Sequence, residues 1–166
     1  MRPPVEVRSL RAGEAEALAR LTVAAYTSVP GFDPGEAYLA ELADVGRRAA
    51  VAVVLVAVDA DGAVVGGATY VPGISPYAEF DDPADAGIRM LAVAPEAQGR
   101  GVGAALVRAC VARARAEERP RLWLHTTEHM TAARRLYERE GFRRAPDHDW
   151  QGTDLRLLSY RLDLAG

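Results

Sequence analysis

The sequence contains no lysine and no asparagine, and its only thiol is Cys110. All 20 basic residues are arginine, so any role for a base or an amide must fall to other side chains. A single cysteine cannot form an internal disulfide, which fits a reducing compartment. No run of about 18 apolar residues is present, so we expect no membrane span. The first residues lack the apolar core of a secretion signal, and we therefore expect a cytoplasmic protein.

The charge balance also excludes a class of partner. The net charge of −3 gives no basic surface for nucleic acid, and we expect none to bind. The apolar content of 49% and charged content of 26% are ordinary for a globular protein. A length of 166 residues suits one domain with a full core, so we expect residues 1–166 to form a single domain.

Hydrophobic periodicity predicts a mixed arrangement of strands and helices. A capping Asp33 before Pro34, with Glu36 two residues later, predicts a helix start. Residues 72–86 form a long loop, a kind that is often functional. In chain order we expect a strand at 5–10, helices at 13–27 and 33–45, strands at 51–58, 63–71 and 88–93, a helix at 101–118, a strand at 121–126, a helix at 131–140, and strands at 142–145 and 155–162. The central strand–helix–strand crossover requires a parallel pair and the hairpins require antiparallel pairs.

A glycine-rich loop follows the strand at 88–93. Gly99, Gly101 and Gly103 leave backbone N–H groups uncovered where a helix begins, which is an arrangement that binds phosphate. The spacing matches a loose dinucleotide fingerprint, but that site needs an acidic residue about 20 positions later, where the chain has Leu124–Thr127. A Walker loop needs a lysine. Both nucleotide interpretations are therefore disfavoured.

Two motifs about 35 residues apart carry a family resemblance. Gln98–Gly103 matches the pattern Gln/Arg-x-x-Gly-x-Gly/Ala, and it follows the strand and exit Met90–Pro95. Ala133–Phe142 supplies a short helix followed by Gly-Phe. Together they resemble the GNAT superfamily of acetyl-CoA-dependent N-acetyltransferases. The resemblance implies an α+β fold, with a mixed and mostly antiparallel sheet of about six to seven strands, a splayed pair of fourth and fifth strands, and about four flanking helices.

The same resemblance implies how acetyl-CoA binds. The pantetheine arm would pair with the backbone of the splayed fourth strand, and the diphosphate would rest on the amides of the glycine loop. Gly101 and Gly103 would be glycine to leave room for the phosphates. No metal is expected. The implied cofactor-binding residues are Leu91, Ala92, Val93, Gln98, Gly99, Arg100, Gly101, Val102, Gly103, Ala133 and Tyr137.

Two residues are candidates for the proton transfers of a direct acetyl transfer. Tyr137 stands where this family commonly places the acid that protonates the leaving thiolate. Relatives often carry a glutamate base in the fourth strand, but this chain has Gly87 there, so Glu79 in the preceding loop is the candidate base. Met130 stands where relatives often have an asparagine that contacts the cofactor. These two departures leave open a second hypothesis, a catalytically weak acetyl-CoA sensor.

The acceptor is expected to be an amine, either a small molecule or a peptide. Aromatic and acidic residues of the first two helices and two later loops would suit a small cation. The fold cannot choose between acceptors, and it allows a homodimer. The expected acceptor-site residues are Tyr26, Phe32, Glu36, Tyr38, Tyr77, Glu79, Phe80, Asp81, Asp147, Asp149 and Trp150.

Overall fold

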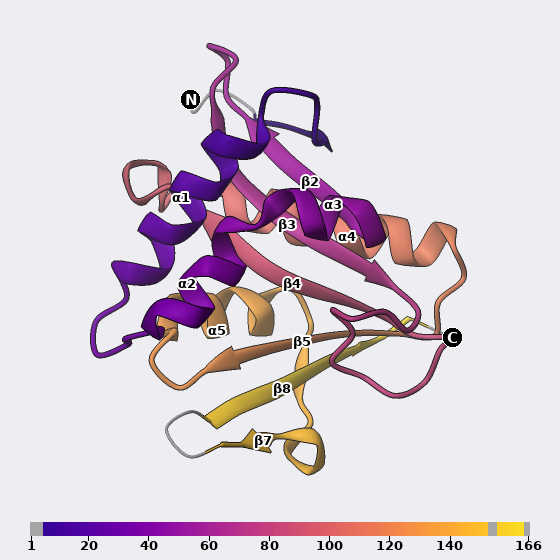
Figure 1. The fold of residues 1–166 in the computed structure, drawn as a ribbon. Helices are drawn as coiled ribbons and strands as arrows, with labels where there is room; N and C mark the ends of the chain where they lie inside the picture. Colours follow the sequence, from indigo (N-terminus) through magenta and orange to yellow (C-terminus); the bar gives the residue numbers. More distant parts are fainter. Residues whose placement is uncertain (1–4, 153–155, 165–166) are drawn as a thin grey trace.

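A mixed sheet lies between two groups of helices in the computed structural model, which describes residues 5–152 and 156–164 (Figure 1). The described strands are β1 (Glu6–Ser9), β2 (Val53–Val58), β3 (Val64–Pro72), β4 (Ala86–Val93), β5 (Arg121–Thr127), β6 (Arg143–Arg144), β7 (Trp150–Gln151) and β8 (Arg156–Asp163). The described helices are α1 (Ala15–Thr27), α2 (Gly35–Ala43), α3 (Val45–Val51), α4 (Val102–Ala116) and α5 (Thr131–Arg139), with 3₁₀ turns at Pro95–Ala97 and Pro146–His148.

The strand order is β1-β2-β3-β4-β5-β8-β6, and β7 pairs with β8. Among the described strands, β4 and β5 form the parallel pair and the other pairs are antiparallel. α4 connects β4 to β5, as a parallel crossover requires. The predicted fold class, α+β with a mixed and mostly antiparallel sheet, is therefore confirmed.

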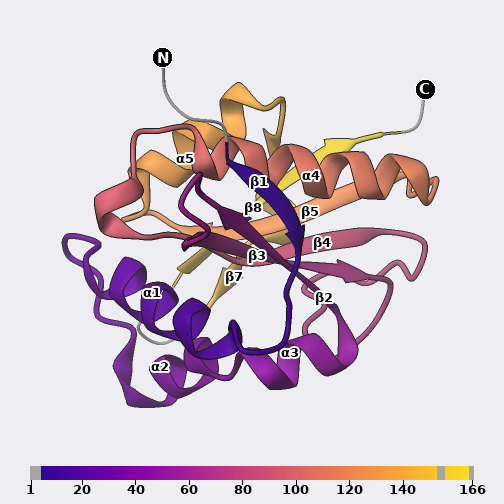
Figure 2. The same cartoon turned by 90° about the horizontal axis from the view of Figure 1, so that it is seen from above.

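The helices cover opposite faces of the sheet. Figure 2 shows α4 and α5 on one side and α1, α2 and α3 on the other. α1, which was predicted at 13–27, buries Leu18, Leu21, Thr22 and Ala25 against the sheet. α4 buries Val102, Leu106, Val107, Cys110 and Ala114 against the other face. Both helices also contact β4, so the end of this strand lies between the two layers.

The helix predicted at 33–45 is α2 in the structure, and α3 follows it as a helix that was not predicted. α2 ends at Ala43, and the carboxylate of Asp44 accepts a hydrogen bond from the Arg47 N–H to begin α3. The buried guanidinium of Arg48 donates to the carbonyls of Glu41 and Leu42, which satisfies the end of α2. The predicted strand start at Val51 was wrong for the same reason, because Val51 closes α3.

The C-terminal part also differs in detail. Gly141 ends α5 in a left-handed conformation, as predicted, with φ of 95°. The strand predicted at 142–145 contains only Arg143 and Arg144, and β7 was not predicted. The described chain thus has a sheet of eight strands, where about six to seven were expected, and five α-helices, where about four were expected. No helix within residues 5–152 and 156–164 has the length and apolar character to cross a bilayer.

Candidate functional site

The sheet opens in its middle, between β4 and β5. The two strands pair only at Ala86, Gly87 and Ile88 of β4 within the described chain. Beyond Ile88 they diverge, so backbone groups on this side of β4 have no strand partner. This is the splay expected for the fourth and fifth strands.

A β-bulge changes the direction of β4 just after this point. Gly67 pairs with Ala92 and Thr69 pairs with Arg89, so Met90 and Leu91 together oppose one residue of β3. Met90 adopts φ of 54°, which is uncommon for a residue with a side chain. Leu91 and Val93 are half-buried beside the opening, and Ala92 is buried. The bulge therefore presents the predicted pantetheine-binding backbone at the mouth of the splay.

The glycine loop lies at the end of the same strand. Gln98, Gly99, Arg100 and Gly101 are exposed. The Gln98 side-chain amide donates to the Val93 carbonyl at 3.2 Å, which ties the loop to β4. Gly101 is the N-cap of α4 with φ of 81°, and no side chain caps that helix end. The first-turn amides of α4 thus face outward without a side-chain acceptor, as an anion site requires.

The two later glycines of the loop are needed for different reasons. A side chain at Gly101 would meet no atom within 4 Å, so its left-handed backbone is the local reason for glycine. A Cβ at Gly103 would lie 3.0 Å from Leu136 of α5, so this glycine permits close packing of α4 and α5. The structure therefore gives Gly103 a packing reason beside the predicted one. Val102 is buried in the core under the loop.

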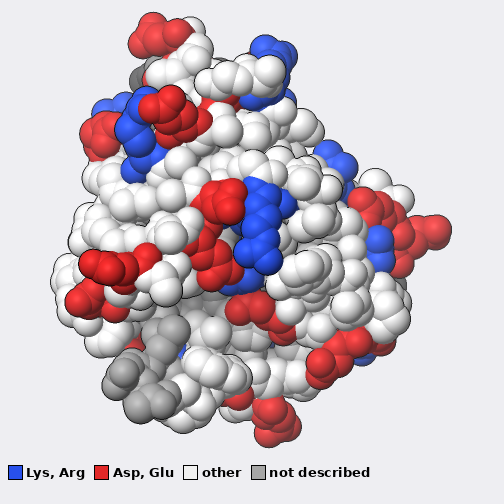
Figure 3. Space-filling view, in the orientation of Figure 1, with Lys and Arg blue, Asp and Glu red and all other residues white. Residues whose placement is uncertain are grey.

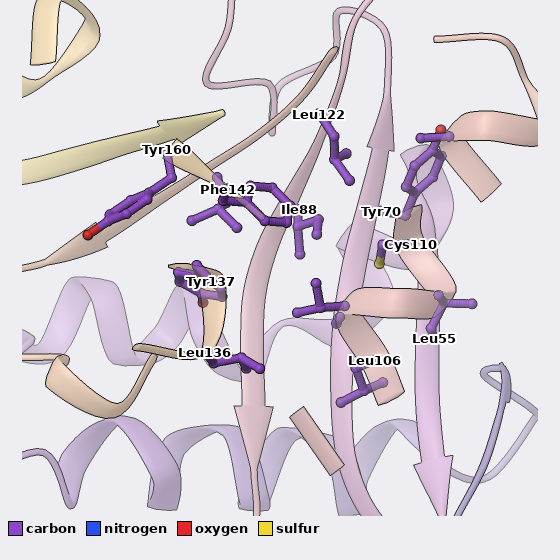
Figure 4. Packing of buried hydrophobic residues seen from close by; sticks show 14 of the residues in the cluster. Leu55, Tyr70, Ile88, Leu106, Cys110, Leu122, Leu136, Tyr137, Phe142 and Tyr160 are labelled. Atoms are coloured by element: carbon purple, nitrogen blue, oxygen red, sulfur yellow. The ribbon is translucent and has the colours of Figure 1, made fainter. Parts of the chain in front are cut away.

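Tyr137 lies on the inner face of α5, and Ala133 is half-buried one turn earlier. The Tyr137 ring centroid is 6.2 Å from that of Phe142 and 6.1 Å from that of Tyr160 (Figure 4). Burial raises the pKa of the Tyr137 phenol, and the nearby Cys110 and Tyr160 add to the rise. Its hydroxyl makes no hydrogen bond to any residue in the described ranges. The phenol remains protonated at neutral pH, as a proton donor must.

A cavity of about 80 Å³ opens beside the bulge, between α1, α2 and the ends of β4 and β5. Its walls combine aromatic, charged and hydroxyl side chains. The lining residues are Tyr26, Phe32, Tyr38, Glu79, Arg89, Met90, His125, Thr126, Thr127, Met130 and Leu157. The rings of Tyr26 and Tyr38 meet edge to face, with centroids 6.1 Å apart. Burial raises the pKa of both tyrosines, and the Tyr137 phenol is close enough to contribute to the rise at Tyr26.

Charged groups at and beside the cavity form one connected cluster. Nε of Arg89 lies 3.1 Å from the Glu79 carboxylate, and its Nη1 lies 3.8 Å from Glu41. Nδ1 of His125 lies 3.8 Å from Oε1 of Glu79, the same oxygen that Nε of Arg89 contacts. Burial lowers the pKa of His125, so its imidazole is neutral at neutral pH. Within the lining, Glu79 and Arg89 balance each other, and the Glu41 carboxylate adds one negative charge just outside the lining.

A buried hydroxyl adds an unused hydrogen-bonding group. The Thr127 hydroxyl is fully buried and has no partner among the described residues. Side chains alternate along β5, so His125 and Thr127 share the face that borders the cavity. Thr126 also lines the cavity, and its hydroxyl donates to the Met130 sulfur at 3.3 Å. Met130, which replaces the expected asparagine, therefore closes the cavity through contact with β5.

Several predicted acceptor-site residues lie elsewhere. Tyr77 and Phe80 pack with Val71 and Trp123 in a separate buried cluster. The expectation that these two residues line the acceptor site was therefore wrong. A Cβ at Gly87 would lie 2.8 Å from the Phe80 ring, which explains why this position holds glycine and not a larger residue. Trp150 is exposed and, with Glu36, Asp81, Asp147 and Asp149, is absent from the cavity wall.

Asp149 instead has a structural role. Its carboxylate accepts hydrogen bonds from Arg144, Arg156 and the Ser159 N–H. Arg144 and these other donors hold the pKa of Asp149 well below its usual range. Arg89 and Thr127 were missed by the sequence reasoning. A cation between Ile88 and Met90, in an otherwise apolar strand, was the signal for Arg89, and the alternation of Trp123, His125 and Thr127 was the signal for Thr127.

The surface charge is mixed. On the face that Figure 3 shows, basic and acidic side chains are interspersed and no continuous basic area forms. Within the described ranges, no three His, Cys, Asp or Glu side chains gather in a way that could hold a metal ion.

Comparisons with known proteins agree with this geometry. A model described as the acetyltransferase (GNAT) family matches residues 15–142. The yncA protein of Salmonella typhimurium, solved with its cofactor acetyl-CoA, is 20% identical, with a TM-score of 0.71 over 97% of this chain and 94% of that chain. A GCN5-related N-acetyltransferase from Kribbella flavida is 24% identical, with a TM-score of 0.70 over 96% and 98%.

A third solved structure has a protein as its named acceptor. Ribosomal-protein-alanine N-acetyltransferase from Brucella melitensis is 22% identical to this chain, with a TM-score of 0.69 over 96% of this chain and 99% of that one. At these identities the structural likenesses establish the fold, and the family model establishes the family. The comparison with curated proteins gave no match.

Proposed function

The chain belongs to the acetyltransferase (GNAT) family, and from that premise we propose that its acceptor is a small cationic amine that enters the cavity beside the β4 bulge. Members of this family transfer an acetyl group from acetyl-CoA to an amine, and this chain is accordingly an acetyl-CoA-dependent N-acetyltransferase. The observation that carries the proposal is the position of the cavity, whose wall includes Met90 at the point where β4 leaves β5.

The residues predicted to hold acetyl-CoA fit that substrate. The uncapped end of α4, entered through the left-handed Gly101, supplies outward amides and a partial positive charge for the diphosphate. Exposed Gln98, Gly99 and Arg100 complete the loop, and Val102 and Gly103 begin the helix. The unpaired side of Leu91, Ala92 and Val93 supplies donors and acceptors for the pantetheine arm, much as an added strand would use them. Ala133 lies on the α5 face toward this region.

The shape and charge of the cavity favour a small amine over a folded protein. The site is a recess walled by side chains of α1, α2, β4 and β5, which an acceptor must enter rather than dock against. Tyr26, Phe32 and Tyr38 form an aromatic wall, and the net negative charge around Glu79 attracts an ammonium group. A peptide N-terminus is the alternative acceptor, since only its first residue would have to enter.

Tyr137 and Glu79, the two predicted catalytic residues, would act in the acetyl transfer. The amine nitrogen attacks the thioester carbon, the C–S bond breaks, and its electron pair leaves with sulfur. Tyr137 donates a proton to the developing thiolate. Glu79 supplies the carboxylate beside which the acceptor ammonium loses its proton. A backbone N–H of the splayed β4 stabilises the oxyanion of the tetrahedral intermediate.

The test is acetyl-CoA binding by calorimetry, followed by thiol release across a panel of small amines and short peptides. We expect saturable binding and turnover that is fastest with small amines. Turnover only with peptides would overturn the small-molecule acceptor. Binding without turnover on any amine would instead support a sensor. Sedimentation of the same sample tests the homodimer that the resemblance allows, and a cytoplasmic location remains a prediction from the sequence.

A further inference from the structure

The cavity contains an imidazole that the family resemblance does not assign. His125 lies on β5 on the face that borders the cavity, and its side chain is 7% exposed. Neither ring nitrogen hydrogen-bonds to a residue of the described ranges. The fully buried unpartnered side-chain atoms there are Nε of Arg48 and the hydroxyls of Tyr77 and Thr127. The His125 nitrogens are not among them, so they can be reached from the cavity.

The surroundings of Glu79 make it a poor final acceptor for a proton. Its carboxylate is held by Nε of Arg89 at 3.1 Å. A proton placed on this carboxylate would remove the charge that Arg89 pairs with, in a site that is only partly solvated. Protonation of His125 would break no ion pair of this kind. Its Nδ1 lies 3.8 Å from Glu79, a distance that can shorten when an acceptor fills the cavity.

The charges around His125 keep it ready to accept a proton. Burial lowers its pKa, and the nearby Arg89 and His148 lower it further. Glu79 and Asp149 oppose this change. The other titratable groups of the cavity, Tyr26 and Tyr38, are uncharged phenols. A neutral imidazole that carries its proton on Nδ1, the nitrogen 3.8 Å from Glu79, has a lone pair on Nε2 that can accept a proton.

We propose that His125 is the base that takes the proton from the acceptor ammonium, and that Glu79 is a positioning residue that holds its Nδ1–H. This inference rests on the proposed function. The ammonium gives one proton to Nε2, and the neutral amine attacks the thioester carbon. The C–S electron pair leaves with sulfur, which takes the second amine proton through Tyr137. The imidazolium then releases its proton to solvent, so the products are the amide, coenzyme A thiol and one proton.

The kinetic test compares His125→Gln with the matched control His129→Gln, since His129 lies outside the cavity wall. We expect kcat to fall about 100-fold in the first variant and to be unchanged in the second. The acidic limb of the wild-type pH–rate profile should disappear in His125→Gln. In Glu79→Gln that limb should move to lower pH, because the carboxylate that supports the imidazolium is gone. Added imidazole should restore turnover to His125→Ala.

The spectroscopic test does not need turnover. Long-range ¹H–¹⁵N spectra of the wild-type protein should show His125 neutral at pH 7 with its proton on Nδ1, and Glu79→Gln should remove that preference. An Nε2–H tautomer, or an imidazolium at pH 7, would overturn the assignment of His125 as base. An unchanged kcat in His125→Gln, with a wild type that turns over, would overturn it and leave the proposed function standing. If the wild type acetylates no amine, the proposed function fails, and the spectra alone decide whether Glu79 positions the ring.

Discussion

The replacement Gly101→Ala tests two roles of this glycine separately: its effect on folding stability and its effect on the affinity for acetyl-CoA. Gly101 has φ of 81°, and an added Cβ would meet no atom within 4 Å. The cost to folding is therefore conformational, about 1–2 kcal/mol for a residue with a side chain in the left-handed region. A protein of this size loses roughly 2–4 °C of melting temperature for each kcal/mol.

Gly62 offers a matched control far from the site. It lies in the β2–β3 turn with φ of 83°, and a Cβ there would also meet nothing within 4 Å. Gly62→Ala should therefore lose about the same melting temperature as Gly101→Ala. Only the Gly101 variant should lose affinity for acetyl-CoA. The alanine keeps its N–H, but the added Cβ displaces the phosphate from one amide, and the loss of that charge-assisted hydrogen bond, worth about 1.5–3 kcal/mol, raises Kd about 10- to 150-fold.

Calorimetry with acetyl-CoA and thermal unfolding of both variants measure these two effects separately. Equal Kd values in the two variants and the wild type would refute the assignment of the diphosphate to the start of α4. A larger loss of melting temperature in Gly101→Ala than in Gly62→Ala would show that the loop is packed more tightly than its open surroundings indicate.

Four further predictions concern single side chains. Tyr137→Phe should lower kcat tenfold or more in a thiol-release assay with little change in melting temperature; unchanged turnover would remove its acid role. Thr127→Val removes a buried hydroxyl without a partner in the described chain, so urea denaturation should show equal or greater stability, while a higher acceptor KM would place that hydroxyl on the substrate. Burial raises the pKa of Cys110 to about 12, so the native protein should not react with a thiol reagent at pH 8 but should react once unfolded in urea. Arg8 lowers the pKa of Glu14 to about 2, below its unfolded value, so its contribution to stability is present above about pH 4.5 and is lost as pH falls towards 2; Glu14→Gln should flatten the pH dependence of the urea midpoint there.

The sequence predicted the elements whose signals are local. The first helix, the glycine loop and the short helix that ends before Gly141 each depend on a few neighbouring residues, and all three were found as expected. The start of α3 was missed because its signal is weak. Asp44 both ends one helix and caps the next, and the buried Arg48 that bridges them resembles a surface arginine in sequence.

The acceptor side of the site was harder to predict because it depends on how one loop folds. Loop 72–86 places Tyr77 and Phe80 in the core and Glu79, between them, in the cavity. Composition alone cannot separate these three neighbours. Arg89, which lies beside Glu79, comes from a strand that was expected to contribute backbone groups only. Contacts between segments distant in sequence therefore decide which side chains meet the acceptor.

The divergence of β4 from β5 has a consequence for solubility. A free strand edge at the rim of a sheet invites pairing with another chain and hence aggregation. Here the unpaired stretch of β4 lies inside the sheet, with β5 on one flank and helices α1 and α4 above and below. These backbone groups therefore face a partner strand of the same sheet and not an outer edge of the molecule. The fold thereby leaves backbone groups of β4 available to a ligand without adding an exposed strand edge that would favour aggregation.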